Sequence, residues 1–307
     1  MTIEGKIKQI VGRMKSVFLN VVLTFFLYIN KLRQMIKNER SNLLVIISIF
    51  CLTAIVMCVC IGPMFYDPMY FAKTEVKEIG ISPCSVYLFG TDNLGRDVLA
   101  RVLVGGRLSL EIAIIASFVT VIIGTFYGMI SGFWGGWIDG VMMRIVDGLY
   151  AVPFIFFAIL LVTLFGRKFY LIFIAIACVS WLDIAKIVRG QVMSIKKKEF
   201  IDAERIVGLG NFQIVCKHIL PNLIGLIIVY ATLTIPNILS LTAFLGFIGL
   251  GVQPPMTGWG EMISEGSQCI VRGYWWVLAF PCLFLSLTLL SLNFISNAIR
   301  NKFDHKS

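Results

Sequence analysis

The chain has 307 residues, of which 58% are apolar and 14% are charged, and its mean hydropathy is +0.88. A soluble domain has roughly a quarter of its residues charged, so this composition indicates a membrane protein. The formal net charge of +10 does not indicate a nucleic-acid partner, because the basic residues flank hydrophobic segments instead of forming a recognition surface.

Residues 1–40 form a basic segment that contains a short apolar run at 17–29. Basic residues ahead of a short hydrophobic region are typical of a signal peptide, but no small-residue cleavage site follows. A helix of this length rises about 20 Å, which is short of the roughly 30 Å hydrocarbon core. The run therefore predicts an interfacial helix. A short extra span is the alternative, and it would leave the orientation of the later segments unchanged.

Six apolar segments predict membrane-spanning helices. They are Leu43–Ile61, Ile112–Ile130, Leu149–Phe165, Phe169–Val188, Leu223–Leu241 and Trp275–Phe294. Prolines inside three of them, Pro153, Pro236 and Pro281, favour kinks. The predicted fold is therefore all-α, with six transmembrane helices over residues 41–300 and a short tail at 301–307.

A polar block at 90–110 precedes the second predicted span and is dense in glycine and charge. Asp92, Arg96, Asp97 and Arg101 have spacings that allow ion pairs along an interfacial helix. A merely solvated loop is the alternative. After the second span, 131–136 predicts a tight aromatic–glycine turn.

Residues 199–221 are the longest polar interruption in the C-terminal two-thirds of the chain, and we call them the docking loop. They predict two short helices separated by a glycine turn at 208–210. Asn211 is the expected N-cap of the second helix, and Pro221 is expected to stop it or to start the next element. The predicted apolar stripe consists of Phe200, Ala203, Ile206, Val207, Phe212, Val215, Cys216 and Ile219. Such a loop between spans indicates a docking surface for a soluble partner; an ordinary amphipathic loop is the alternative.

Most of the 27 lysines and arginines fall in segments that are cytoplasmic if the N-terminus is inside. The positive-inside rule therefore predicts cytoplasmic N- and C-termini, a cytoplasmic docking loop and an external 90–110 block. Cys84 and Cys269 then lie outside, and whether they form a disulfide is left open.

Charges near the predicted spans occur at i, i+3 spacing, in Arg144 with Asp147 and in Asp183 with Lys186. Each pair is expected to neutralise itself on one helix face. The two readings are a role in lining the pathway and a position at the cytoplasmic headgroups, and the helix-end positions favour the second.

The docking loop resembles the EAA loop of ABC importer permeases, through Asp202-Ala203-Glu204, then Gly208, then Leu220-Pro221. In that family the loop is the coupling helix that docks on the ATPase subunit. Asp202 replaces the usual glutamate, and Glu204 replaces an alanine where a small residue normally allows close packing. The docking residues that the resemblance implies are Glu199, Asp202, Ala203, Glu204, Gly208, His218, Leu220 and Pro221.

Three further blocks resemble the dipeptide/oligopeptide/nickel branch of these permeases. The first, the 90–107 motif, contains Gly90, Thr91, Asp92, Gly95, Arg96, Asp97, Arg101 and Arg107. The second, 181–191, has Asp183 where a small residue is usual and Lys186 where arginine is usual. The third runs from 245 to 255 and continues through Thr257 and Trp259-Gly260. The resemblance covers roughly 41–300 and identifies the chain as the C-type permease of a heterodimeric pair.

The resemblance implies a permease subunit of an ATP-driven importer in a prokaryotic cell membrane. Its expected partners are membrane lipid, a second homologous permease, two ATPases, an external substrate-binding protein and a peptide-like substrate. No phosphate-binding loop or metal-ligand cluster occurs, so we expect no catalysis, no metal and no cofactor on this chain, with ATP and magnesium on the ATPases. Import of nickel or a metal chelate is the alternative within this architecture, and an ion-coupled secondary transporter is the alternative from another class.

Overall fold

A computed structural model describes residues 43–64, 78–166 and 169–304. The interfacial helix expected at 17–29 lies outside these ranges. Within them the chain is mostly helical, and the one extended pairing is an isolated bridge between Thr91 and Asp97. The elements are α2 (Leu43–Ile61), η1 (Gly62–Met64), α3 (Val98–Trp134), α4 (Gly136–Tyr150), α5 (Phe154–Phe165), α6 (Phe169–Lys196), α7 (Glu199–Ile206), α8 (Asn211–Ile214), the π-helical turn η4 (Val215–Ile219), α9 (Leu220–Phe247), α10 (Trp259–Cys269), η5 (Ile270–Arg272) and α11 (Trp276–Asp304).

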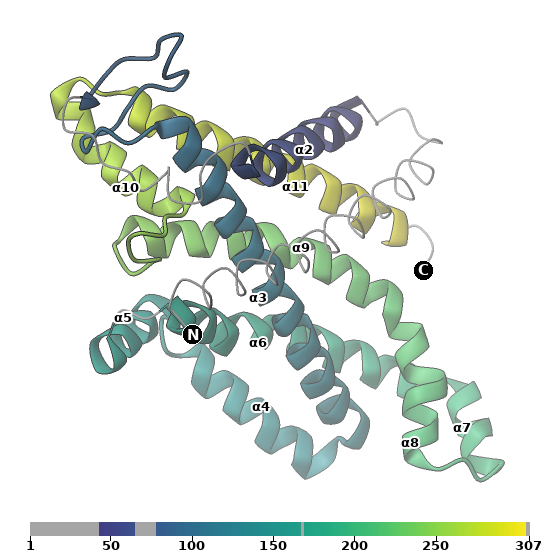
Figure 1. Ribbon diagram of the computed structural model, residues 1–307. Coiled ribbons are helices and arrows are strands. Elements are labelled where there is room, and N and C mark those ends of the chain that lie inside the picture. The colour runs from purple at the N-terminus through teal and green to yellow at the C-terminus, as the bar shows by residue number, and fades with distance from the viewer. Residues whose placement is uncertain (1–42, 65–77, 167–168, 305–307) are drawn as a thin grey trace, which may run out of the picture.

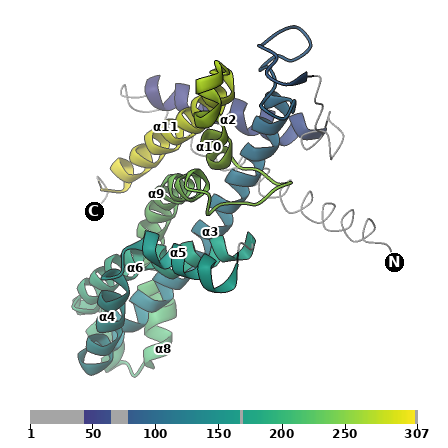
Figure 2. The same cartoon turned by 90° about the vertical axis from the view of Figure 1, so that its left-hand side faces the viewer.

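Helix α3 runs the length of the molecule and separates its two ends (Figures 1 and 2). Its 37 residues correspond to about 55 Å of helix. The 90–107 motif and α10 lie at its N-terminal end, and α7 and α8 lie at the other. The prediction placed the start of this helix at Ile112, but Asp97 caps it at Val98 by accepting a bond from Leu99 N–H. The turn predicted at 131–136 is shorter than expected, because Ser131–Trp134 is still helical and only Gly135 and Gly136 have positive φ.

Close packing of α3 on α6 depends on three glycines spaced four residues apart. A Cβ atom at Gly124 would lie 2.7 Å from Ile184 Cβ, one at Gly128 would lie 2.4 Å from Ala185 O, and one at Gly132 would lie 2.7 Å from Arg189 O. These distances are too short for any side chain, so the glycines allow the two backbones to approach. This contact fixes α6, and through it the docking loop, against the central helix.

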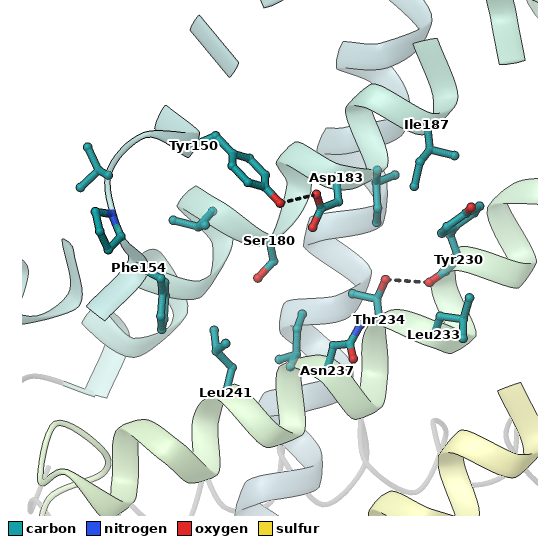
Figure 3. A pocket seen from close by; sticks show the side chains of 15 residues that line it. Tyr150, Phe154, Ser180, Asp183, Ile187, Tyr230, Leu233, Thr234, Asn237 and Leu241 are labelled. Carbon is teal, nitrogen blue, oxygen red and sulfur yellow. Dashed lines mark hydrogen bonds between the residues drawn. The ribbon is translucent and has the colours of Figure 1, made fainter. Parts of the chain in front are cut away.

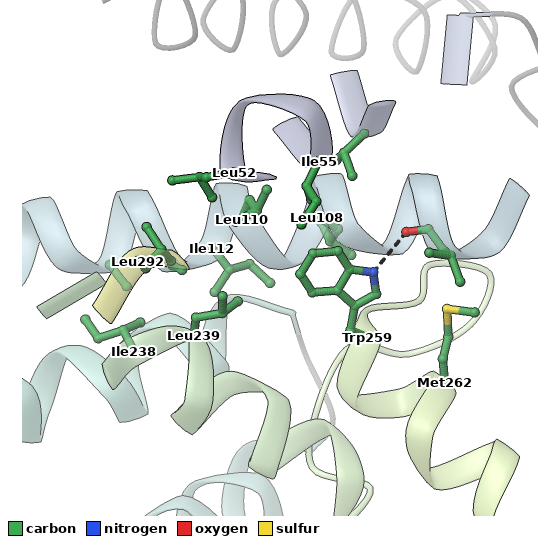
Figure 4. Close-up of a cluster of buried hydrophobic side chains, with 14 of the residues drawn as sticks. Leu52, Ile55, Leu108, Leu110, Ile112, Ile238, Leu239, Trp259, Met262 and Leu292 are labelled. Atoms are coloured by element: carbon green, nitrogen blue, oxygen red, sulfur yellow. Dashed lines mark hydrogen bonds between the residues drawn. The ribbon is translucent and has the colours of Figure 1, made fainter. Parts of the chain in front are cut away.

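Two main groups of buried side chains hold the helices together. The larger one joins α2, α3, α9, α10 and α11 around Leu52, Leu110, Leu239 and Trp259 (Figure 4). The other joins α3, α6, α9 and the docking loop, and its buried members are Val121, Met129, Phe133, Ile184, Val188, Val192, Ile195, Ile201, Ile214, Val215, Ile219 and Leu223. The docking loop is therefore part of the packed body of the protein.

The described residues contain four helices long and apolar enough to cross a membrane, or five if α4 and α5 together form one span. The predicted count of six is not fully confirmed. The interpretation of Leu149–Phe165 as one helix was wrong: α4 ends at Tyr150, α5 begins at Phe154, and their axes differ by 79°. Pro153 lies at the break as the N-cap of α5, since proline fixes φ and cannot donate to the preceding turn. The segment Phe169–Val188 lies within α6 and stays a predicted span, because the side chains at its start are outside the described part.

Candidate functional site

The first helix of the docking loop ends at Ile206, just before the predicted glycine turn, where Gly208 has φ +92°. Gly208 N–H donates to Arg205 O at 3.0 Å, and Leu209 N–H donates to Glu204 O at 3.1 Å. These two bonds form a Schellman motif, in which a left-handed glycine satisfies the last carbonyls of a helix. The turn direction that leads from α7 to α8 therefore depends on a conformation that glycine adopts readily and other residues do not.

The second half of the docking loop differs from the prediction. Asn211 is the first helical residue and not the N-cap; the cap is Gly210, whose N–H donates to Gln213 Oε1 at 3.3 Å. Pro221 does not stop the helix. It lies in the first turn of α9, which agrees with the alternative that it starts the next element, and α8, η4 and α9 together form one continuous helix from Asn211 to Phe247. The wider π-helical turn before Pro221 makes room for its ring, and Asn222 Nδ2 donates to His218 O at 2.6 Å.

Apolar side chains of the docking loop point both into the protein and out of it. Ile201, Ile214 and Ile219 are fully buried and anchor the loop. Ile206 is 87% exposed, and Val207 and Phe212 are each 77% exposed. The predicted stripe is thus divided, with Val215 and Ile219 facing inward. Phe200, Ala203, Ile206, Val207 and Phe212 are exposed, and we call them the outer apolar face.

Two of the three acidic residues of the docking loop, Asp202 and Glu204, have partners within the loop. Glu204 Oε1 lies 3.4 Å from His218 Nε2, which links α7 to η4. Asp202 Oδ1 lies 3.5 Å from Arg205 Nη1. The glutamate that replaces a small residue in the family pattern is therefore turned toward the neighbouring helix, and it leaves the outer apolar face unobstructed. Glu199 is exposed at the start of α7.

Asp92 organises the 90–107 motif at the opposite end of α3. Its carboxylate is fully buried and accepts bonds from Leu94 N–H at 2.8 Å and Arg96 N–H at 3.0 Å. It also pairs with Arg96 Nε at 2.7 Å and with Arg101 Nη1 at 2.6 Å. Both guanidinium groups reach Glu265 on α10, at 2.9 and 2.7 Å. The motif is thus a largely buried charge network that joins the start of α3 to α10.

The predicted ion pairing between Asp92 and Arg96 is confirmed, but its setting was wrong. Asp92 and Arg96 lie in a turn that precedes α3, with positive φ at Gly90 and Gly95, and no interfacial helix carries them. Asp97 serves as the N-cap of α3 and forms no ion pair among the described residues. Burial raises the pKa of its carboxyl. Thr91 Oγ1 accepts from Ile81 N–H at 2.8 Å, and Arg107 pairs with Glu111 at 3.0 Å.

The glycine-rich block before α10 packs onto the same end of α3. The carboxylate of Glu261 accepts bonds from Val252 N–H and from Gly258 N–H, the latter at 3.0 Å, and burial raises the pKa of this carboxyl. The indole of Trp259 is buried against α3 and donates to Val102 O at 3.0 Å (Figure 4). A Cβ at Gly106 would lie 2.4 Å from this ring. Two motifs far apart in the sequence therefore form one packed unit.

A cavity of about 640 Å³ lies between α6 and α9, beside the break that separates α4 from α5 (Figure 3). Tyr150 Oη donates to Asp183 Oδ1 at 3.0 Å at its rim. Lys186 Nζ lies 2.9 Å from Asp147 Oδ1 and 4.6 Å from the centre of the Tyr150 ring. The expected self-neutralising pairs on single helices are therefore wrong, since the contacts run between α4 and α6.

Sequence reasoning missed two features of the described structure. Arg189 on α6 binds both oxygens of Asp139 on α4, and Ser131 donates to the same carboxylate. The sequence carries no local signal for this contact between distant segments. The packing of α3 on α6 did leave a signal, since Gly124, Gly128 and Gly132 have the spacing typical of close helix contacts in membranes.

Cys84 and Cys269 are not bonded to each other; Cys84 is exposed and Cys269 is buried. In the ranges that the structure covers, no cluster of three or more His, Cys, Asp or Glu side chains is arranged to hold a metal ion.

Comparisons with known proteins agree with this architecture. Residues 124–307 match the family model described as binding-protein-dependent transport system inner membrane component. The chain is 45% identical over 272 residues to the oligopeptide transport system permease protein OppC of Salmonella typhimurium, covering 88% of this chain and 89% of that one. It is 43% identical to OppC of Haemophilus influenzae (89% and 87% covered) and 38% identical to the dipeptide transport system permease protein DppC of Bacillus subtilis (88% and 84% covered).

Among solved structures, two crystal forms of the MetNI methionine ABC transporter in inward-facing conformations have similar folds. The TM-scores are 0.51 and 0.54, with 20% and 19% sequence identity. The matches cover 65% and 66% of this chain, and 96% of the MetNI chain in each case. At this identity the likeness concerns the fold alone.

Proposed function

Because this chain belongs to the family of binding-protein-dependent transport system inner membrane components, we propose that it forms, with a second homologous permease, the path by which an ABC importer carries peptides across the cell membrane. The peptide substrate is proposed from the relatives, which are oligopeptide and dipeptide permeases. An external binding protein delivers the cargo. Two ATPase subunits, which bind ATP and magnesium, supply the energy.

The outer apolar face of the docking loop is the single observation that carries the coupling role. Four large apolar side chains on a loop that is otherwise firmly packed need a partner surface. The anchors Ile201, Ile214 and Ile219 hold that face in place. We therefore assign it to the ATPase, with the termini on the same, cytoplasmic side of the membrane. The 90–107 motif on the external side is assigned a structural role, as a clamp between α3 and α10.

The helices on either side of the docking loop supply the route from the ATPase to the cavity. Helix α6 ends just before the loop, and the continuous helix 211–247 begins inside it. Both helices line the cavity, through residues such as Asp183 on α6 and Asn237 on α9. When the ATPases close, a displacement of the loop is transmitted along both walls and opens the cavity to one side or the other. The loop binds open and closed ATPases with different affinities, and this difference determines to which side the cavity opens.

The test is affinity purification of the tagged permease from native membranes, followed by mass spectrometry. We expect a second permease and two ATPases with the wild-type protein. The double variant Ile206→Glu/Val207→Glu, which places two charges on the outer apolar face, should lose the ATPases and keep the sister permease. Val271→Glu is the matched control. Val271 is a similarly exposed apolar residue (92%), but it lies in η5 next to α10 and not on the docking loop.

Retention of the ATPases by the double variant would contradict the docking role. Purification of the wild-type protein alone, or as a homo-oligomer, would contradict the importer assembly and favour an ion-coupled transporter. Co-purification with a binding protein that takes up nickel or a metal chelate would keep the architecture and replace the peptide substrate.

A further inference from the structure

The cavity between α6 and α9 has the size of a small-ligand site, since about 640 Å³ lies within the usual range of roughly 300–1,000 Å³. Most of its wall is apolar, as at Val179, Ile187 and Leu233. Ser180 on α6 and Asn237 on α9 add neutral polar groups of the kind that bind peptide amides (Figure 3). Asp183 is the one charged side chain among the described lining residues.

Asp183 has no basic partner in the described part of the chain. Its Oδ1 accepts the hydrogen bond from Tyr150. The cation one helical turn away, Lys186, is bound to Asp147 and lies against the Tyr150 ring. The carboxylate therefore has no neutralising cation among the described residues, and most of the wall beside it is apolar.

We propose that Asp183 makes this cavity a cation-selecting site on the translocation path, which binds the ammonium or guanidinium side chain of a peptide in transit. The inference rests on the proposed peptide transport. A single exposed carboxylate suits this task, because cargo must bind well enough to enter and weakly enough to leave. The preference belongs to the permease and adds to whatever the binding protein selects.

The test measures uptake of two tripeptides, Ala-Lys-Ala and Ala-Glu-Ala, by the complete importer at saturating binding protein and cargo. Asp183→Asn should lower the ratio of lysine to glutamate peptide uptake about fivefold, the size expected for one exposed charge pair. Asp183→Glu should preserve the ratio. Ser180→Ala is the matched control on the same wall, and it should change the uptake of both peptides equally. The binding protein is identical in every assay, so its own preference cancels.

An unchanged ratio in Asp183→Asn, with uptake of both peptides intact or equally reduced, would overturn the cation-selecting role. A ratio that falls as far in Asp183→Glu as in Asp183→Asn would overturn it too, because the effect would then follow packing and not charge. Failure of the wild-type importer to take up either peptide would instead overturn the proposed function, and this inference with it.

Discussion

Gly208 shows how one residue shapes the surface that we assign to the ATPase. Its φ of +92° permits the turn between α7 and α8, and a Cβ there would meet no other atom within 4 Å. Glycine is therefore required at 208 for its backbone conformation, and not because a side chain would clash with a neighbour. Glu204 is the complementary case. It departs from the family pattern, and its contact with His218 accounts for how a larger, charged residue fits there.

We expect Gly208→Val to impair uptake about tenfold while leaving membrane insertion intact, since a β-branched residue at positive φ costs roughly 1–2 kcal/mol. Uptake by the complete importer and the amount of chain in the membrane are the two measurements. Gly210→Ala is the matched control, because Gly210 has φ −68° and open space around it. Equal losses in both variants would show that the left-handed turn is not what matters.

At the scale of the elements, the close contact between α3 and α6 connects the two ends of the molecule to the docking loop and the cavity. It joins the central helix to the element that leads into the docking loop and lines the cavity. The three glycines allow the two backbones to pack closely. A displacement of the loop should therefore move α6 together with α3.

Gly128→Ala should destabilise the protein by about 1–3 kcal/mol, because overpacking at a close helix contact forces the backbones apart. The measurement is the apparent melting temperature in detergent. Gly140→Ala is the matched control on α4, where a Cβ meets nothing within 4 Å, and it should raise stability by roughly 0.5–1 kcal/mol. A melting temperature unchanged by Gly128→Ala would mean that the helices can separate at little cost.

At the scale of the whole molecule, the 90–107 motif and the docking loop lie at opposite ends of α3 (Figure 1). Two native cysteines can show on which side of the membrane each end lies. Cys84 is exposed near the motif, and Cys216 is exposed on the docking loop. If α3 crosses the membrane as proposed, the two thiols face opposite sides.

We expect a membrane-impermeant thiol reagent to label Cys84 in intact cells and Cys216 only after permeabilisation. The experiment uses variants that each retain one of the two cysteines, expressed without the ATPases so that the docking loop is uncovered. Labelling of Cys216 from outside would reverse the proposed orientation. Labelling of both thiols from the same side would mean that α3 does not cross the membrane.

The sequence by itself determined the class of the protein and where its special segments lie. Long apolar runs and few charges require a lipid environment, and local signals such as Gly208 predicted the end of α7 correctly. The positions at which the helices begin and end were harder to predict from the sequence. Pro221 and Pro153 look alike as helix breakers in sequence, yet the helix continues through the first and breaks at the second.

The tertiary structure alone decided which distant residues meet. Asp92 and Glu265, or Asp139 and Arg189, are brought together by helix packing, and no local spacing encodes such contacts. The same holds for the direction of the docking loop's apolar side chains. A helix period indicates which residues share a face, but only the neighbours of α7 and η4 decide which face is covered. The isolation of Asp183 also depends on tertiary contacts, because Lys186 is drawn away by Asp147 from another helix.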